Sequence, residues 1–346
     1  MRIVVDAMGG DYAPVEVVKG AVDAALADNL EIVLVGKQPL IEAELAKYRG
    51  CDSCLSLVHA SEVVECSEQP TEAIRSKPDS SIVVGMNLLK SGQASAFVSA
   101  GASGAVVCAA MLSLGKLDGV ARPALACLFP STKGLVLLID AGANADCRPP
   151  FLVQFAQMGS IFMEKIQGVE RPRVGLLSSG EEVSKGNRLV KEAHQLLRAT
   201  NLNFVGNIEG KDIPRGLADV VVTDGFTGNV ALKTSEGMGE AIYAALKEAL
   251  NNNTIPGITS FLMRPALRAL SRWVDYSEYG GALLVGVPGN VIVAHGRSHS
   301  GAIRNAILLA KKSVESQFVE MLRQQTLAPA PENNNSSNSN SGGNHG

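Results

Sequence analysis

The sequence has few aromatic residues, only five histidines and no repeated cysteine motif. Six cysteines are scattered along the chain, and only Cys51 and Cys54 come as close as a CxxC pair. A structural zinc site needs four ligands, and neither a second pair nor a histidine cluster follows. The spacing therefore favours thiols that act as small buried apolar groups in a reducing cytosol, and it predicts a protein without a metal or cofactor.

Long apolar runs and an excess of basic charge are also absent. No apolar stretch reaches the ~20 residues that a membrane-spanning helix needs. The first residues, MRIVVDAMGG, resemble a strand and not a signal peptide. The net charge of -3 argues against a nucleic-acid-binding protein. We expect a cytoplasmic protein, with at most a peripheral contact at the inner face of the membrane.

Short β-branched runs alternate with longer helical patterns along most of the chain. The predicted strands are Ile3–Asp6, Ile32–Gly36, Ser56–Val58, Ala96–Ser99, Gly134–Asp140, Arg173–Leu177, Phe204–Gly206, Val220–Thr223 and Val291–Ala294. The predicted helices include Pro14–Ala27, Pro39–Arg49, Ser81–Ser91, Gly104–Gly115, Pro150–Gln167, Gly186–Ala199 and Gly228–Asn251. This alternation predicts an α/β fold with a mostly parallel sheet and helical crossovers. We take residues 1–327 as one catalytic domain, in which two subdomains can share the sheet.

Two segments differ from this pattern. Residues 328–346 are rich in Asn, Ser and Gly and almost without apolar side chains, so we expect a disordered tail. Residues 255–274 carry an apolar stripe and regularly spaced arginines, which predict a helical hairpin near 250–275. This hairpin is either a docking surface for a membrane or an acidic carrier protein, or a helix of a dimer interface or of the core.

Residues that directly follow strands are the candidates for a site, because open α/β sheets bind ligands beyond the carboxyl ends of their strands. Two glycines follow the first strand and let the backbone approach a ligand. Small residues after the fourth predicted strand lead into a helix, whose free N–H groups and dipole attract anions. Each turn is also compatible with a plain strand-to-helix connection. The candidates for phosphate binding are Asp6, Gly9, Gly10, Ser99, Gly101, Ser103 and Gly104.

A lysine lies in the turn after the strand Arg173–Leu177. Lys185 comes at the start of a predicted helix, where a positive charge opposes the helix dipole unless an anion lies between them. We therefore predict that Lys185 binds phosphate, with Asn187 beside it. The alternative is a solvated surface lysine.

The turn DGFTGN leads from a strand into a long helix and predicts another anion site. The amide of Asn229 lies in the first turn of that helix and can donate a hydrogen bond to a developing oxyanion. The same motif contributes Asp224, Gly225, Thr227 and Gly228.

The turn Asp140–Cys147 follows the strongest predicted strand and is as compatible with helix capping as with ligand binding. His295 follows the strand Val291–Ala294, and a structural role is as compatible with that position as a catalytic one. We treat His59 and His194 as surface or core residues.

Taken together, the motifs resemble the phosphate acyltransferases of bacterial phospholipid synthesis. The matching segments are VDAMGGD at the start, DGFTGNVALK at 224–233, VDYSEYGGALLVGV at 274–287 and AHG at 294–296. The resemblance covers about residues 1–315, with the motifs in one consistent order. The chain departs from the family at Ala102-Ser103, where Asn-Thr is usual, and at Ser178-Ser179, where Asn-Ile is usual.

The resemblance implies a three-layer α/β/α fold, similar to isocitrate and isopropylmalate dehydrogenases and to phosphotransacetylase, and a homodimer. It implies an acyltransferase that moves a fatty acyl group from acyl carrier protein to inorganic phosphate. The acyl phosphate would then serve phosphatidic acid and phospholipid synthesis through a membrane-bound glycerol-phosphate acyltransferase.

This chemistry requires no nucleophilic side chain from the protein, because phosphate is the nucleophile. A thiol has a pKa of about 8.5, so its thiolate leaves readily. The enzyme has to hold phosphate, align it with the thioester and stabilise the oxyanion, without a covalent intermediate. On this basis we assign Lys185 to the phosphate charge, Asn229 to the phosphate or oxyanion, and His295 to the carbonyl or phosphate.

Three alternatives are considered. A phosphotransacetylase-like enzyme would use acyl-CoA instead of acyl carrier protein. A decarboxylating dehydrogenase of similar fold would need a divalent metal and clustered aspartates, and the sequence has neither that cluster nor a nicotinamide fingerprint. A non-catalytic binding protein of the same fold would not need Lys185 and Asn229 together.

Overall fold

The computed structural model describes residues 1–51, 53–251 and 279–325. The predicted hairpin at 255–274 and the predicted tail at 328–346 lie outside these residues. Within the described ranges, one sheet has the strand order β3-β2-β1-β4-β11-β10-β5-β6-β9-β7-β8. Its strands are β1 Arg2–Asp6, β2 Glu31–Gly36, β3 Leu55–His59, β4 Ala96–Ser99, β5 Ala124–Ser131, β6 Gly134–Ile139, β7 Arg173–Leu177, β8 Asn203–Ile208, β9 Val220–Val222, β10 Ala282–Val285 and β11 Asn290–Val293.

The sheet consists of two parallel sets joined through antiparallel strands. On one side β1, β2, β3, β4 and β11 run parallel, and on the other β6, β7, β8 and β9 do. Strand β10 is antiparallel to β11 and to β5, and β5 is antiparallel to β6. Three reversals separate the two sets, so their strands point in opposite directions. Through β10 and β5, Val293 at the end of β11 is level with Leu138 near the end of β6. The two sets therefore run toward each other, and their carboxyl ends lie at about the same level, on either side of β10 and β5.

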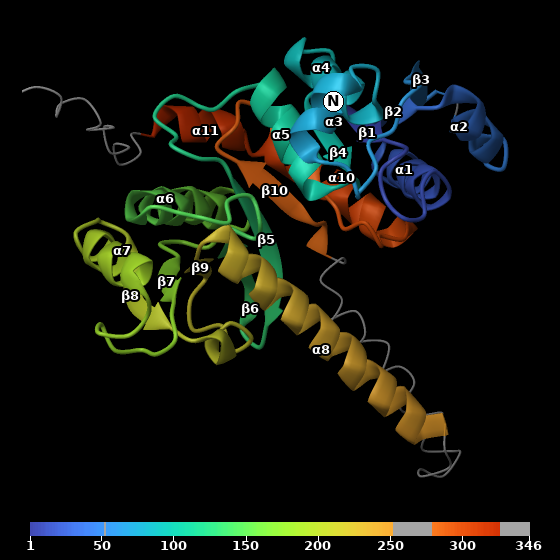
Figure 1. The fold of residues 1–346 in the computed structure, drawn as a ribbon. Coiled ribbons are helices and arrows are strands. Elements are labelled where there is room, and N and C mark those ends of the chain that lie inside the picture. Colours follow the sequence, from blue (N-terminus) through green and yellow to red (C-terminus); the bar gives the residue numbers. More distant parts are fainter. Residues whose placement is uncertain (52, 252–278, 326–346) are drawn as a thin grey trace, which may run out of the picture.

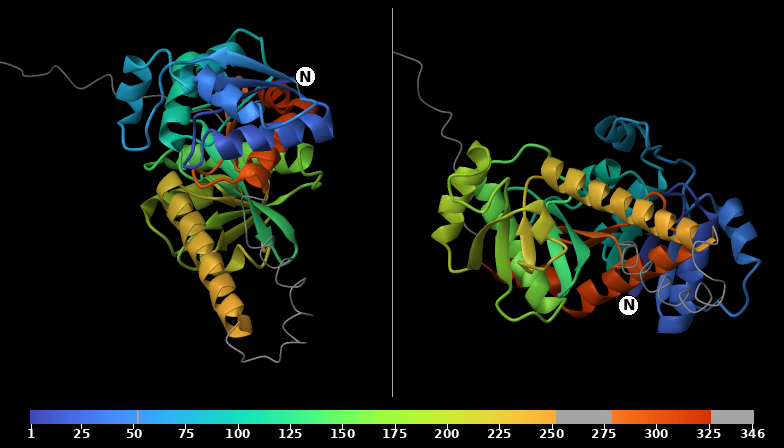
Figure 2. Two further views of the ribbon diagram at one scale, coloured as in Figure 1. Left: turned by 90° about the vertical axis from the view of Figure 1, so that its right-hand side faces the viewer. Right: turned by 90° about the horizontal axis from the view of Figure 1, so that it is seen from below.

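Helices cover both faces of this sheet, which gives three layers (Figures 1 and 2). Alternate strand residues enter different cores: Ile3 and Val5 pack on one face, and Val4 packs on the other. The first face is covered by α1 Val15–Asp28, α2 Gln38–Leu45, α6 Pro149–Lys165, α7 Arg188–Arg198, α10 Ser300–Glu315 and α11 Phe318–Gln324. The second face is covered by α3 Pro70–Ser76, α4 Ser81–Lys90, α5 Ser103–Ser113 and the start of α8 Gly225–Asn251.

The predicted α/β fold with a mostly parallel sheet is confirmed, but the prediction missed β5 and β10. The first contains Pro130 and two alanines, and the second has only four residues after two glycines, so neither looks like a typical strand in isolation. The two strands pair with each other although they lie more than 150 positions apart. Helix α8 begins at Gly225 and not at Gly228 as predicted.

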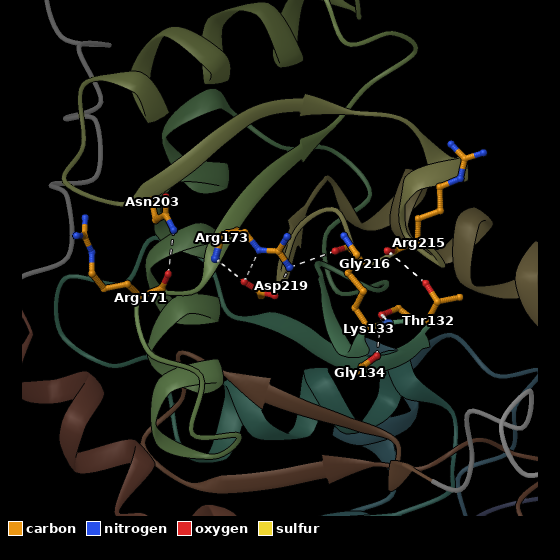
Figure 3. A network of polar contacts seen from close by, with 10 residues as sticks. Thr132, Lys133, Gly134, Arg171, Arg173, Asn203, Arg215, Gly216 and Asp219 are labelled. Atoms are coloured by element: carbon orange, nitrogen blue, oxygen red, sulfur yellow. Dashed lines mark hydrogen bonds and ion pairs between the residues drawn. The ribbon is translucent and has the colours of Figure 1, made fainter.

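An ion pair fixes the start of β7 against the start of β9. The guanidinium of Arg173 donates two hydrogen bonds to Asp219, at 3.0 Å from Nε and 2.7 Å from Nη2, and its backbone N–H donates a third at 2.7 Å (Figure 3). Arg173 also donates to the Gly216 carbonyl at 3.1 Å. These bonds set the relative position of two strands whose far ends carry candidate site turns.

In the described part of the chain, every helix is too short or too polar to cross a membrane.

Candidate active site

The turns after β1 and β4 form one hydrogen-bonded unit around Asp6. Its carboxylate accepts hydrogen bonds from the Met8 backbone N–H at 3.0 Å and from the Ser99 hydroxyl at 2.7 Å, and Ser99 in turn accepts one from Gly101 N–H at 3.0 Å. Asp6 is buried, and burial raises its pKa, while hydrogen bonds oppose that shift. Gly9 lies against this carboxylate, and a Cβ there would come within 2.6 Å of Asp6 Oδ2. Asp6 and Ser99 therefore hold the turn in shape.

Three more residues that were predicted to bind phosphate lie at the rim of the turns around Asp6. Ser103 and Gly104 begin α5 and are exposed, and no side chain caps this helix. Gly10 has φ of +104° and lies close to the Gly296 carbonyl oxygen, to which Asp11 N–H donates at 2.8 Å. The turns after β1, β4 and β11 thus meet, and the free N–H groups of α5 face outward beside them.

His295 is held in one tautomer at this meeting point. Its Nδ1 accepts a hydrogen bond from Arg297 N–H at 3.2 Å, so in the neutral ring the proton is on Nε2. Nε2 lies 3.8 Å from Glu236 Oε2, a buried carboxylate on α8. Burial lowers the pKa of His295, and the positive charges of Arg297 and Lys233 lower it further. At neutral pH the ring is therefore a neutral hydrogen-bond donor.

The turn after β6 is built around the buried carboxylate of Asp140. Its Oδ1 accepts from the backbone N–H groups of Leu125, Gly142 and Ala143 at 2.9, 3.1 and 2.9 Å. Its Oδ2 accepts from the backbone and side chain of Asn144 at 2.7 and 2.8 Å. Burial raises the pKa of Asp140, and the five donors act against that shift. The residue organises its own turn and caps no helix, since α6 begins after Arg148 without a side-chain cap.

The turn after β9 packs directly on the Asp140 turn. Asp224 caps α8, because its carboxylate accepts from the backbone and the hydroxyl of Thr227, both at 2.8 Å. A Cβ on Gly228 would overlap the carbonyl oxygen of Asp140, so only glycine allows this contact. Gly225 N–H donates to the Asn144 carbonyl at 2.7 Å.

Asn229 projects from α8 onto the same turn. Its Nδ2 lies 3.3 Å from the Ala141 carbonyl oxygen, and it also contacts Gly142. Within the described ranges, no hydrogen bond joins the second N–H of this amide or its oxygen to another residue, which leaves both to a ligand.

Lys185 lies in the turn after β7, which is the strand next to β9. Its side chain is exposed, and no hydrogen bond or ion pair joins its ammonium to another residue of the described ranges. Asn187, predicted to lie beside the phosphate, caps α7 and accepts from Val190 N–H at 2.9 Å.

A buried chain of polar groups fixes the Lys185 turn. His194 Nδ1 lies 2.9 Å from Asn207 Oδ1, and Asn207 Nδ2 donates to the Glu182 carbonyl at 3.0 Å. That carbonyl also accepts from Lys185 N–H at 3.0 Å. His194 is a core residue as predicted, while His59 is exposed.

Helix α8 contacts both groups of turns, which lie on either side of β10 and β5. It starts beside the Asp140 turn and reaches the His295 turn through Glu236 and, one turn later, through Glu240, which pairs with Arg297 at 3.2 Å. Sequence reasoning missed Glu236, Glu240 and Arg297. Asn229, Glu236 and Glu240 lie seven and four positions apart, a spacing that puts them on one side of a helix and could have indicated the contact.

No group of three or more His, Cys, Asp or Glu side chains with the geometry of a metal site occurs in the described ranges. Burial raises the pKa of Cys127 and of Cys147 to about 12, so neither supplies a thiolate. The prediction of buried thiols is correct for Cys51 and Cys127 and wrong for Cys66, which is exposed.

The fold matches several solved enzymes. A phosphotransacetylase from Streptococcus pyogenes superposes with a TM-score of 0.60 at 18% identity, covering 92% of this chain and 94% of that one. A 4-hydroxythreonine-4-phosphate dehydrogenase from Klebsiella pneumoniae gives 0.52 at 16% identity, covering 91% of this chain and 99% of that one. Fold and turns together define an α/β/α enzyme of the phosphotransacetylase type of architecture.

Sequence comparison identifies the family. The model of the family described as "Fatty acid synthesis protein" matches residues 1–321. A phosphate acyltransferase from Pelotomaculum thermopropionicum is 47% identical over 323 residues, 93% of this chain and 94% of that protein. One from Heliobacterium modesticaldum is 48% identical over 325 residues, 94% and 97% of the two chains. The chain belongs to the phosphate acyltransferase family, and its relatives are transferases.

Proposed function

We propose that the protein transfers a fatty acyl group from the thioester of acyl carrier protein to inorganic phosphate and supplies acyl phosphate for phosphatidic acid and phospholipid synthesis. The observation that carries this proposal is the set of donors along α8. The Asn229 amide projects from α8 onto the Asp140 turn, and the neutral His295 imidazole lies on the turn that Glu236 of α8 contacts. Lys185 lies on the turn after β7, the strand next to β9. Membership of the phosphate acyltransferase family supports the reaction class.

The donors suit a reaction in which phosphate is the nucleophile. A phosphate oxygen attacks the thioester carbonyl carbon, and the carbonyl electron pair moves onto its oxygen, which accepts a hydrogen bond from one of Asn229 and His295 while the other donates to the phosphate. When the intermediate collapses, the C–S bond breaks and acyl phosphate forms. The thiolate takes the proton that hydrogen phosphate carried, so the step needs no other reactant. Lys185 balances the phosphate charge, and the α5 start with Ser103 and Gly104 offers backbone donors.

The first prediction tests the reaction itself. Incubation with acyl-acyl-carrier-protein and phosphate should yield acyl phosphate, detected by mass spectrometry or as the hydroxamate after trapping with hydroxylamine. Omission of phosphate should abolish the product. A parallel reaction with acyl-CoA distinguishes the phosphotransacetylase-like alternative, which the structural neighbours favour. If neither donor gives acyl phosphate, the proposed function is wrong.

We also propose that residues 1–327 form one catalytic domain and that the enzyme is a homodimer. The continuous sheet supports the single domain. For the dimer, the support is an apolar side of α8 that faces solvent: Met238, Ile242 and Leu246 are spaced four apart and are 57%, 50% and 37% exposed.

The second prediction is that Met238→Glu combined with Ile242→Glu converts the dimer to a monomer. Two carboxylates would have to be buried in an apolar contact, which is strongly unfavourable. Sedimentation velocity at micromolar concentration measures the outcome, and Lys247→Glu on the same helix serves as the control. A wild-type protein that sediments as a monomer, or a double variant that stays dimeric, contradicts the proposal.

The remaining proposals concern location. A long-chain acyl phosphate partitions into lipid, so a cytoplasmic enzyme in peripheral contact with the inner face of the membrane, next to a glycerol-phosphate acyltransferase, would pass on its product efficiently. The segment 255–274, predicted to contact lipid or carrier protein, lies outside the described residues.

A further inference from the structure

Helix α8 carries a lysine midway between the two groups of turns. Lys233 is four positions after Asn229 and three before Glu236, so all three side chains leave the same side of the helix. Asn229 contacts the Ala141 carbonyl at one end, and Glu236 approaches His295 at the other. Lys233 therefore stands between the two donors assigned to the reaction.

The ammonium of Lys233 has no partner that the structure describes. The neighbouring acidic residues on α8 are directed elsewhere, since Glu236 faces His295 and Glu240 pairs with Arg297 at 3.2 Å. Lys233 itself is exposed and makes no hydrogen bond or ion pair with any residue of the described ranges. Its positive charge nevertheless lies close enough to His295 to lower the pKa of that imidazole. An exposed cation thus lies near the imidazole without an acidic partner among the described residues.

The spacing along the helix lets Lys233 reach an anion near either donor. Asn229 and Glu236 are seven residues apart, which corresponds to about 10 Å along the axis. One phosphate ion can hardly contact side chains at both ends at once. A lysine rooted between them can reach an anion placed near either donor, and its ammonium supplies the compact charge that phosphate binding uses.

We propose that Lys233 is a further catalytic residue, whose ammonium contacts the phosphate nucleophile between Asn229 and His295. This inference rests on the proposed function. The cation attracts phosphate into line with the thioester carbonyl and stabilises the negative charge that moves onto the carbonyl oxygen. It also keeps the His295 imidazole neutral, so that Nε2–H remains a donor and does not form a closed ion pair with Glu236.

Phosphate binding without an acyl donor provides the direct test. Lys233→Ala should weaken phosphate binding about 10- to 100-fold, since a hydrogen bond to a charged group is lost, and Lys233→Arg should restore most of it. Lys247→Ala is the matched control, because Lys247 is exposed on nearly the same side of α8 four turns further on. Equilibrium dialysis with radioactive inorganic phosphate measures each affinity, and thermal unfolding checks that the variants fold.

A second measurement reports the position of the ammonium independently of turnover. NMR titration of labelled histidine should show a higher pKa for His295 in Lys233→Ala and an unchanged pKa in Lys247→Ala. The other charged groups that face this ring are Glu236, Glu240, Asp11 and Arg297, and they remain in both variants.

The outcomes separate this inference from the function on which it rests. Weaker phosphate binding together with a raised His295 pKa supports the role of Lys233, even if the wild-type protein makes no acyl phosphate, in which case only the proposed function fails. Unchanged phosphate affinity and unchanged His295 titration in Lys233→Ala overturn the inference, even when the wild type makes acyl phosphate.

Discussion

Replacement of Asn229 by Ala should lower the rate of acyl-phosphate formation by about 10²–10³-fold, the usual effect of removing one donor to a developing oxyanion. The amide lies at the junction of the Asp140 turn and α8, with one N–H on the Ala141 carbonyl at 3.3 Å and the other available. Lys185→Ala should cause a loss of similar size, mainly through a higher KM for phosphate, because its exposed ammonium has no partner in the described protein.

Both losses should occur with little change in the free energy of unfolding, because neither side chain is buried. Asn201→Ala and Lys191→Ala are matched controls on exposed positions away from the turns after β6 and β9. Initial rates at varied phosphate concentration separate kcat from KM. Near-wild-type turnover by folded Asn229→Ala and Lys185→Ala enzymes would show that the reaction takes place elsewhere.

Replacement of Asp140 by Ala should destabilise the protein by on the order of 3 kcal/mol, since all the hydrogen bonds to one buried carboxylate are lost at once. The carboxylate accepts five hydrogen bonds, from Leu125, Gly142, Ala143 and twice from Asn144. Water entering the space would satisfy part of this set, which keeps the loss below the sum of five separate penalties.

Asp146→Ala is the control for this prediction, because it removes an exposed carboxylate from the same turn. Urea unfolding followed by circular dichroism gives the free energy of unfolding of each variant. Asp140→Asn should lie between the wild type and Asp140→Ala, since an amide oxygen still accepts but its NH₂ faces donors. An Asp140→Ala protein as stable as Asp146→Ala would refute the structural role assigned to this carboxylate.

The strands that sequence reasoning predicted correctly are those whose signal is local. The runs of β6 and β9 are apolar because both faces are covered, as is the Ile3–Val5 part of β1, and each strand is followed by a polar, glycine-containing turn. The reversal of direction at β10 and β5 could not be predicted in the same way. It results from pairing between Ala282–Val285 and Ala124–Cys127, which no local propensity specifies.

Several predicted phosphate ligands prove to be structural in their contacts. Asp224 and Asn187 cap helices, and Asp6 and Ser99 hold each other inside a turn. In the sequence a capping residue and a ligand-binding residue look alike, because both place a short polar side chain just after a strand. Only the positions of the hydrogen-bond partners distinguish them.

The α/β class, the family resemblance and the turns of the candidate site could be predicted from the sequence, because periodicity, motifs and turn composition act over a few residues. Which turns lie together depends on long-range pairing. The register of β10 with β11 and with β5 sets the carboxyl ends of the two parallel sets level with each other, and α8 contacts the turns on both sides through Asn229 and Glu236. Lys233 has its candidate role for the same reason: in the sequence it is one of many lysines, and only the fold places its helix beside His295.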